Sequence, residues 1–407
     1  MAEAKKDSYI SRKDYLEQLI SYKDEQLIKV ITGMRRSGKS TLLFDIYADW
    51  LADNGVTEEQ IIKVDLESME SEPLYNPESL YKYITDKLIK NKPNYVFIDE
   101  VQNCKDFQKV ADSLYLKKGV DVYITGSNAH MFSGELATLL SGRYVTVEIL
   151  PLSFKEYLET AKDENASPEK KYRDYVRFGS LPKVAGYNGN MKKINAYLDG
   201  IYNTIFKKDI IDRNKITNVP LFEDVMKFVM SNIGSHISPK SIADYLTSNR
   251  KTVYSQTVDD FLKYLTDSYM IYKAVRFDIK GKELLKSLAK YYVTDLGIRN
   301  YLLGYRDTDT GHILENVIYL ELLRKGYKVF VGKVANTEVD FVAVKQDETV
   351  YIQVAESVKE KAVLERELAP LKAIRDFNPR LLVTMDYDLN GSYDGIKHVN
   401  ALDFLTE

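Results

Sequence analysis

The chain has 407 residues and a mass of 46.8 kDa, a length that typically forms roughly two to three globular domains. Hydrophobic residues make up 44% and charged residues 29%, which excludes an intrinsically disordered chain, and no apolar run approaches the roughly 18 to 20 residues of a membrane-spanning helix. The formal net charge of −3 is unevenly distributed, because residues 171–300 contain 22 Lys and Arg against 13 Asp and Glu.

The first 150 residues alternate short apolar runs with helical patterns. Such runs are typical of strands buried on both faces, and strands that alternate with helices predict a parallel sheet in an α/β domain. Helices are expected at Ser40–Asn54 and Pro77–Lys90, and Pro151 closes the region. The expected strands are Leu27–Thr32, Ile61–Asp65, Tyr95–Ile98, Val120–Thr125 and Tyr144–Leu150.

Residues 33–40 read GMRRSGKS, an uninterrupted GxxxxGK[ST] sequence between a predicted strand and a predicted helix. This context is typical of a P-loop, in which Gly33 and Gly38 let the backbone wrap around phosphate oxygens at a helix N-terminus. Lys39 is placed to reach the outer phosphates and Ser40 to bind Mg²⁺. A chance match on a loop is the alternative. The expected nucleotide-binding residues are Gly33, Met34, Arg35, Arg36, Ser37, Gly38, Lys39, Ser40 and Thr41.

Two later strands end in polar residues. Tyr95–Ile98 is followed by Asp99 and Glu100, at the sheet edge where ligands bind in open α/β folds. We expect Asp99 to hold the magnesium ion and Glu100 to orient and deprotonate the attacking water, although a solvated acidic turn would look the same. The strand Val120–Thr125 ends in Gly126-Ser127-Asn128, where a polar side chain is placed to bond the γ-phosphate or the water. A helix at Gly134–Leu140 is expected next.

The sequence from Ser153 to about Asn214 predicts helices, with a break at Gly-Ser-Leu-Pro, residues 179–182. Residues 219–293 then predict three short helices and a hairpin, the element order of a winged helix. In this reading the third helix presents Thr252, Tyr254, Ser255, Gln256 and Thr257 to DNA bases. Phosphates are contacted by Arg250, Lys251 and the wing lysines Lys273, Lys280, Lys282 and Lys286, and the wing also carries Arg276. The basic middle of the chain fits such a site. The alternatives are an uneven solvated surface, a protein-interaction module and an ATPase lid.

The last hundred residues return to mixed helix and strand. Glu315 on a helix, Asp340 on a strand and Gln353 on the next strand resemble the PD-(D/E)XK nuclease layout. Active members need a lysine two positions after the third residue, but Ala355 stands there. We expect the nearest cations to be Lys359 and Lys361, some turns away. We therefore expect a nuclease-inactive, scaffold-like domain. Glu338 and Asp340 could equally be acids that keep a strand edge soluble.

The order of these motifs resembles the AAA+ ATPases, and more closely a bacterial and archaeal family of AAA-type ATP-binding proteins with a C-terminal domain of unknown function. The matching strings include ITGMRRSGKSTLL, VFIDEVQ, ITGSNAHM, LSGRY, RFGSLPKV, YYVTDLGIRN and EVDFVA. The resemblance implies ATP and Mg²⁺ as cofactors and a γ-phosphate sensor at Ser127 or, preferably, Asn128. It also implies an arginine finger at Arg143 that reaches a neighbouring subunit, and a lid turn in which Pro182 packs on adenine and Arg177 acts as a second sensor.

Cysteine and histidine are too sparse for other common sites. Cys104 is the sole cysteine, so a disulfide framework or a cysteine-rich zinc site within the chain is excluded, and the four histidines are scattered. The N-terminus lacks the apolar core of a secretory signal. We expect a cytoplasmic protein.

Together these patterns predict an α/β P-loop NTPase with a five-stranded parallel sheet at 1–151. A helical lid at 152–218, a winged helix at 219–300 and a PD-(D/E)XK-like domain at 301–407 would follow. The expected function is Mg²⁺-dependent ATP hydrolysis that drives the remodelling or translocation of DNA, with branched DNA as the specific substrate. The expected assembly is a homo-oligomeric ring, as large as a hexamer. A nucleotide-dependent protein-interaction switch in a defence or toxin-like system, and an ATP-regulated nuclease, are the alternatives.

Overall fold

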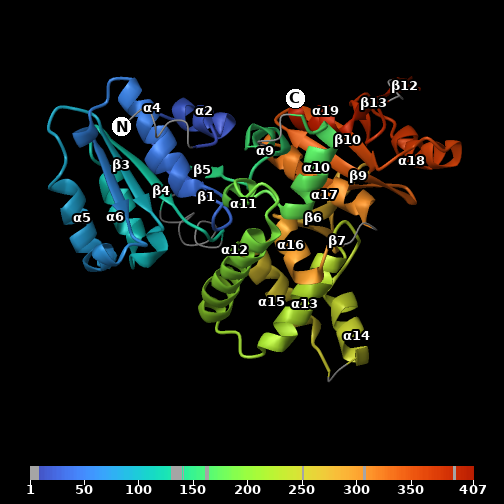
Figure 1. Cartoon of the computed structure of the whole chain (residues 1–407), viewed down its shortest axis with the longest axis horizontal. Coiled ribbons are helices and arrows are strands. Elements are labelled where there is room, and N and C mark those ends of the chain that lie inside the picture. Colours follow the sequence, from blue (N-terminus) through green and yellow to red (C-terminus); the bar gives the residue numbers. More distant parts are fainter. Residues whose placement is uncertain are drawn as a thin grey trace. The chain divides into compact units, whose positions relative to one another are not determined.

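The computed structural model describes residues 9–129, 140, 142–160, 165–249, 252–305, 309–387 and 391–407 (Figure 1). These residues form two compact units. Unit 1 contains the described residues up to Pro151 together with the short segment Asp267–Tyr269. Unit 2 contains Leu152–Thr266 and Met270–Glu407.

Unit 1 is built on a parallel five-stranded sheet with the order β2-β3-β4-β1-β5. Its strands are β1 (Ile28–Thr32), β2 (Ile61–Asp65), β3 (Asn94–Asp99), β4 (Val120–Thr125) and β5 (Tyr144–Glu148). The five predicted strands are confirmed, with small differences at the ends. Strand β5 stops at Glu148 rather than Leu150, because its partner β1 ends at Thr32, the residue that pairs with Glu148.

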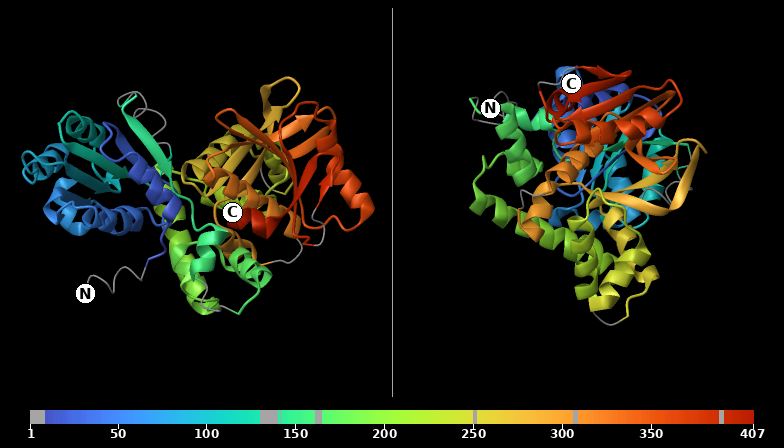
Figure 2. Two further views of the ribbon diagram at one scale, coloured as in Figure 1. Left: turned by 90° about the horizontal axis from the view of Figure 1, so that it is seen from above. Right: turned by 90° about the vertical axis from the view of Figure 1, so that its right-hand side faces the viewer.

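Helices cover both faces of this sheet (Figures 1 and 2). One face packs on α2 (Lys13–Ser21) and on a helix that starts as α3 (Lys39–Thr41), widens into the π-helix η1 (Leu42–Tyr47) and continues as α4 (Ala48–Asp53). The other face packs on α5 (Pro77–Thr85) and α6 (Phe107–Tyr115). Short 3-10 turns complete the unit: η2 (Glu58–Gln60), η3 (Met69–Tyr75) and η4 (Val101–Asn103).

One predicted helix is shorter in the structure, and another falls mostly outside the described residues. Helix α5 ends at Thr85 and not at Lys90, because the amides of Lys87 and Leu88 bond carbonyls three residues back and tighten the chain out of the α-helix. The expected helix Gly134–Leu140 falls on residues 134–139, which lie outside the described residues, and on Leu140, which is buried.

Unit 2 begins with helices and ends in a mixed α/β layer. Helices α10 and α12 start behind side-chain caps from Ser167 and Asn190, and Pro168 occupies the first turn of α10, as helix N-termini favour. Its helices are α9 (Phe154–Thr160), α10 (Pro168–Phe178), α11 (Pro182–Ala185), α12 (Met191–Thr204), the π-helix η5 (Ile205–Asp212), α13 (Val219–Ser231), α14 (Pro239–Asn249), α15 (Ser255–Asp267), α16 (Leu296–Leu303), α17 (Thr310–Arg324), α18 (Lys361–Ala373) and α19 (Ala401–Thr406).

One continuous eight-stranded sheet dominates the second half of unit 2, with the order β12-β13-β11-β10-β9-β8-β6-β7. Its strands are β6 (Ile271–Asp278), β7 (Glu283–Val293), β8 (Lys328–Val334), β9 (Thr337–Lys345), β10 (Glu348–Ala355), β11 (Arg380–Thr384), β12 (Ser392–Tyr393) and β13 (Ile396–Asn400). Helix α18 packs on one face, where Leu371 meets Val342 and Leu382. On α17, Tyr319 stacks on Tyr292 of β7 with ring centroids 4.2 Å apart.

The hairpin expected as a wing belongs to this sheet. Helices α13, α14 and α15 precede β6 and β7 in the expected order, and Ile237, between α13 and α14, bridges to Ala289 on β7. Strand β6 also pairs in parallel with β8, through Arg276–Asp278 and Val331–Lys333. The hairpin that follows the three helices and the strands of the tail therefore form one sheet. Within the described ranges, no helix has both the length and the apolar character needed to cross a membrane.

Candidate nucleotide site

The loop after β1 turns in a way that requires glycine. Gly33 has a φ of 134°, and a Cβ atom there would lie 2.2 Å from the carbonyl oxygen of Ile149. Gly38 has a φ of 101° and precedes the first residue of α3. Because both conformations are open mainly to glycine, the loop can wrap its amides around a group placed at the helix N-terminus.

Lys39 is buried inside this loop. Its Nζ atom donates to the carbonyl oxygens of Gly33 at 3.0 Å and Met34 at 3.1 Å. The ammonium is thereby held across the loop, where phosphate oxygens would be equally good acceptors. Arg35 lies farther out and pairs with Glu67 at 2.7 Å.

Asp99, at the end of β3, faces the start of the loop helix. Its buried carboxylate accepts hydrogen bonds from the hydroxyls of Ser40 and Thr125. Burial raises the pKa of Asp99, and these two hydrogen bonds oppose the shift. A hydroxyl and a carboxylate are oxygen ligands that suit Mg²⁺. The described residues contain no group of three His, Cys, Asp or Glu side chains that could hold a metal alone, so phosphate and water would supply the other ligands.

Glu100 is held in place by side chains from two segments. Its backbone is left-handed, with φ 50°, and its amide donates to Thr125 Oγ1 at 3.0 Å. Its Oε2 atom accepts hydrogen bonds from Ser127 Oγ at 3.2 Å and from the side-chain amide of Gln102. The structure therefore brings Ser127 to Glu100. Asn128, the residue after Ser127, is buried as well. Gln102 was not predicted, although it stands only two residues after Glu100.

A second unpredicted residue, Arg12, supports the loop from outside. Its guanidinium is buried and donates to the carbonyl of Ser37 at 3.1 Å and to that of Leu150 at 2.6 Å. It also lies over the ring of Tyr15, 4.8 Å from the centroid. Nothing local in the sequence marks this arginine, because its partners are 25 and 138 residues away.

Arg143 is engaged within its own chain. It pairs with Asp112 on α6, and its guanidinium lies 5.4 Å from the ring centroid of Tyr115. The side chain is 41% exposed. An arginine finger role would require this pair to open.

The expected lid turn serves contacts inside unit 2. The carboxylate of Asp295 accepts from the amide and hydroxyl of Ser180 at 2.6 and 3.0 Å. A Cβ atom on Gly179 would lie 2.7 Å from the Cα atom of Gly297. Pro182 starts α11 directly after this turn, and Arg177 lies over the ring of Tyr305.

The expected DNA-binding residues are partly visible. Tyr254 is 72% exposed and Gln256, which donates to Asp260 at 3.3 Å, is exposed as well. Lys280 and Lys282 are exposed in the β6–β7 turn. The predictions for Arg250, Lys251 and the side chain of Lys286 lie outside what the structure describes.

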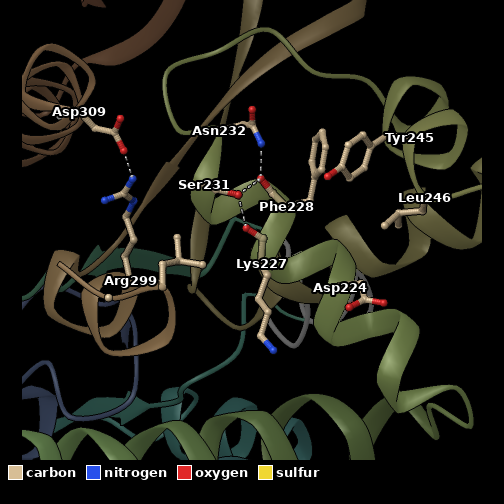
Figure 3. A pocket seen from close by; sticks show the side chains of 11 residues that line it. Asp224, Lys227, Phe228, Ser231, Asn232, Tyr245, Leu246, Arg299 and Asp309 are labelled. Atoms are coloured by element: carbon tan, nitrogen blue, oxygen red, sulfur yellow. Dashed lines mark hydrogen bonds and ion pairs between the residues drawn. The ribbon is translucent and has the colours of Figure 1, made fainter. Parts of the chain in front are cut away.

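Unit 2 also contains a pocket of about 670 Å³ that no sequence pattern predicted (Figure 3). Residues of α13, α14 and α16 line it. Arg299 enters from α16, donates to the carbonyl of Met230 and pairs with Asp309 at 2.9 Å. The ring centroids of Phe228 and Tyr245 are 4.9 Å apart. Figure 3 shows the two rings side by side.

The three tail residues Glu315, Asp340 and Gln353 do lie together, but the expectation about their nearest cation is wrong. Lys290 of β7 approaches Glu315 to 2.8 Å and Asp340 to 3.3 Å. Lys359 instead pairs with Asp386, and Lys361 with Glu365. Burial would lower the pKa of Lys290, but the surrounding carboxylates raise it well above its usual range.

Comparisons with known proteins agree with this geometry. A family model described as an AAA domain matches residues 25–158, and a model described as a domain of unknown function (DUF8612) matches residues 169–309. An uncharacterized protein of Haemophilus influenzae is 38% identical over 401 residues, which cover 98% of this chain and 99% of that protein. The uncharacterized protein MJ1544 of Methanocaldococcus jannaschii is 32% identical over 397 residues, 92% of this chain and 83% of that protein. The Walker-type ATPase PABY2304 of Pyrococcus abyssi aligns with a TM-score of 0.51 over 73% of this chain and 96% of its own; at 16% identity, this likeness concerns the fold alone.

Proposed function

Because the chain belongs to the family of these Haemophilus influenzae and Methanocaldococcus jannaschii proteins and its first unit is an AAA-type P-loop domain, we propose that it hydrolyses ATP with Mg²⁺. The observation that supports this most is the meeting of three groups at one sheet edge. Lys39 follows β1 and Glu100 follows β3, while Asp99 ends β3. Thr125 of β4, the strand between them, bonds both Asp99 and the amide of Glu100.

Each group has a definite role in this proposal. The loop amides and Lys39 bind the phosphates, and Ser40 and Asp99 hold Mg²⁺, which neutralises phosphate charge when bound. Glu100 accepts a proton from the attacking water, and Asn128 contacts the γ-phosphate.

Two substitutions test the assignment. Lys39→Ala should abolish ATP binding, because the ammonium contacts phosphate in the ground state. Glu100→Gln should keep ATP binding and slow phosphate release by about 10²–10⁴, because the carboxylate acts only on the water. Glu17→Gln, which alters an exposed carboxylate of α2 outside the loop, is the control and should leave ATP binding and turnover unchanged. Wild-type turnover in Glu100→Gln would contradict the proposal.

We further propose that the protein works as a ring-shaped homo-oligomer in which Arg143 reaches the nucleotide of a neighbouring subunit. Removing such a finger costs about 10³ or more in turnover and should spare ATP binding. Mixing Arg143→Ala with Lys39→Ala protein should then restore hydrolysis, since one subunit supplies the finger and the other the intact loop. Absence of complementation in stable mixed oligomers would leave Arg143 with its observed partner, Asp112.

DNA is the proposed macromolecular partner. The support is the exposed aromatic ring of Tyr254 at the start of α15 and the exposed lysines at 280 and 282. Replacing both lysines with alanine should reduce the slope of log affinity against log salt by about two, since each neutralised phosphate releases about 0.9 counterions. Lys361→Ala, on the exposed face of α18, is the matched control. An unchanged slope would exclude the hairpin turn as a DNA contact.

The rate of ATP hydrolysis separates DNA action from the main alternative. A remodelling or translocating enzyme should turn over ATP faster with DNA, and forked or four-way DNA should stimulate most. A nucleotide switch that assembles proteins should hydrolyse ATP at the same rate with and without DNA. Measuring phosphate release with linear, forked and no DNA decides between them.

A further inference from the structure

A buried ammonium on β7 meets acids from two elements of the tail, α17 and β9. Lys290 Nζ, on β7, lies 2.8 Å from Glu315 Oε1 of α17. It lies 3.1 Å from Glu338 Oε1 and 3.3 Å from Asp340 Oδ1, both on β9. The lysine side chain is only 6% exposed. One buried ammonium therefore contacts three carboxylates.

Every oxygen of the three carboxylates has a partner within the cluster. Lys290 bonds one oxygen of each. Glu315 Oε1 also accepts from Tyr292 at 2.7 Å, and Glu315 Oε2 faces His312 Nδ1 at 3.6 Å. Glu338 Oε2 pairs with His236. Asp340 Oδ2 accepts from the amide of Val354 at 2.9 Å.

The backbone around the cluster is adapted to this close packing. Gly234 has a φ of 71°, and a Cβ atom there would lie 2.8 Å from His312 Nδ1 and 3.1 Å from Glu315 Oε2. The third residue of the nuclease-like set is also committed. Gln353 accepts from the amide of Asp340 at 3.3 Å and donates to Glu367 at 2.9 Å.

We propose that the ammonium of Lys290 is the resident cation of this cluster and takes the place that a divalent metal would need, so that the tail holds no catalytic metal. Mg²⁺ and Mn²⁺ bind oxygens at about 2.0–2.2 Å, so the three carboxylates would have to shift inward by about 1 Å before they could hold a divalent ion. The lysine prevents this shift by occupying the point between them. As they lie around the lysine they form no metal-binding group, and the described residues contain no other. A buried charge needs such pairing to persist, so the acids and the lysine depend on each other.

The test is the binding of Mn²⁺ to the nucleotide-free, full-length protein, measured by electron paramagnetic resonance and by thermal unfolding. Lys290→Ala should bind one Mn²⁺ at least about tenfold more tightly than the wild type, and Mn²⁺ should raise its unfolding temperature, because a ligand stabilises the state that binds it. The gain should disappear in Lys290→Ala/Asp340→Asn. Lys359→Ala, which removes a lysine 3.9 Å from a different acid, Asp386, should gain no site.

Two results would overturn the proposal. One is Mn²⁺ binding by the wild-type protein that Asp340→Asn abolishes, since the lysine would then yield to metal. The other is a folded Lys290→Ala protein that gains no Mn²⁺. If Lys290→Ala does not fold, the wild-type titration decides alone: absence of Asp340-dependent binding supports the proposal, and its presence refutes it. Cleavage of linear, forked or four-way DNA with Mn²⁺ that is lost in Asp340→Asn but kept in Lys39→Ala would refute it as well.

Discussion

Arg12→Lys should weaken both the folded state and ATP binding, although it keeps the positive charge. The guanidinium reaches the carbonyls of Ser37 and Leu150 at the same time, at 3.1 and 2.6 Å. A lysine ammonium lacks the planar fork and can serve one of them. A hydrogen bond from a charged donor contributes about 1.5–3 kcal/mol, so we expect a loss of about 2 kcal/mol.

That loss acts on the loop that holds the phosphates, because Ser37 is one of its residues. If all of it appears as loop disorder, about 2 kcal/mol corresponds to roughly thirtyfold weaker ATP binding. Titration with a fluorescent ATP analogue and urea unfolding measure the two effects. Lys13→Ala is the matched control, since Lys13 is 77% exposed and its ammonium lies 3.9 Å from the exposed carboxylate of Glu17, a weak surface ion pair. ATP affinity within twofold of wild type, with an unchanged urea midpoint, would refute the role of Arg12.

Three further outcomes follow from the geometry of unit 1. Gly33→Ala should lose ATP binding and lower the unfolding temperature, because its Cβ atom would lie 2.2 Å from Ile149 O, whereas Gly55→Ala, with a φ of 87° but no neighbour within 4 Å, reports backbone strain alone. Gln102→Ala should lower turnover by about tenfold and leave ATP affinity unchanged, because one hydrogen bond to the Glu100 carboxylate is lost and no phosphate contact is; a changed affinity with normal turnover would contradict this. Burial raises the pKa of the Cys104 thiol to about 11, so at pH 8 the folded protein should react with a disulfide reagent at least about 100-fold more slowly than the urea-unfolded chain, and equal rates would contradict the burial.

The sheet of unit 1 could be predicted because its information is local. Strands β1, β3 and β4 are buried along nearly their whole length, as their mostly apolar sequences predict. Strands β2 and β4 have the predicted bounds. The P-loop is contained in eight consecutive residues, so its identity needs no knowledge of the fold. The AAA-type domain expected from the motif order is likewise confirmed by the family match. The roles of single residues in catalysis remain predictions.

What could not be predicted is the partner of a distant charged residue. Arg12 and its acceptor Leu150 are 138 residues apart, and Lys290 and Asp340 are 50 apart. The prediction for the tail considered a lysine at a fixed offset from Gln353, whereas the lysine that meets its acids comes from β7, before the tail begins. The hairpin itself was predicted, yet its pairing with β8 depends on a strand more than 50 residues later.

The net charge of the middle region is equally hard to interpret from the sequence, because charged residues can be paired in the interior. This weakens the argument for DNA binding that rests on composition. Residues 171–300 are basic by composition, but Lys290 and Arg299 are buried, the first among three carboxylates and the second against Asp309. Their charges are neutralised inside unit 2 and cannot attract phosphate. Because a phosphate contact needs an exposed cation, the net charge of the region is not itself evidence of a nucleic-acid surface. The DNA proposal therefore depends on the exposed turn lysines, and the salt slope of their double substitution is the measurement that bears on it most directly.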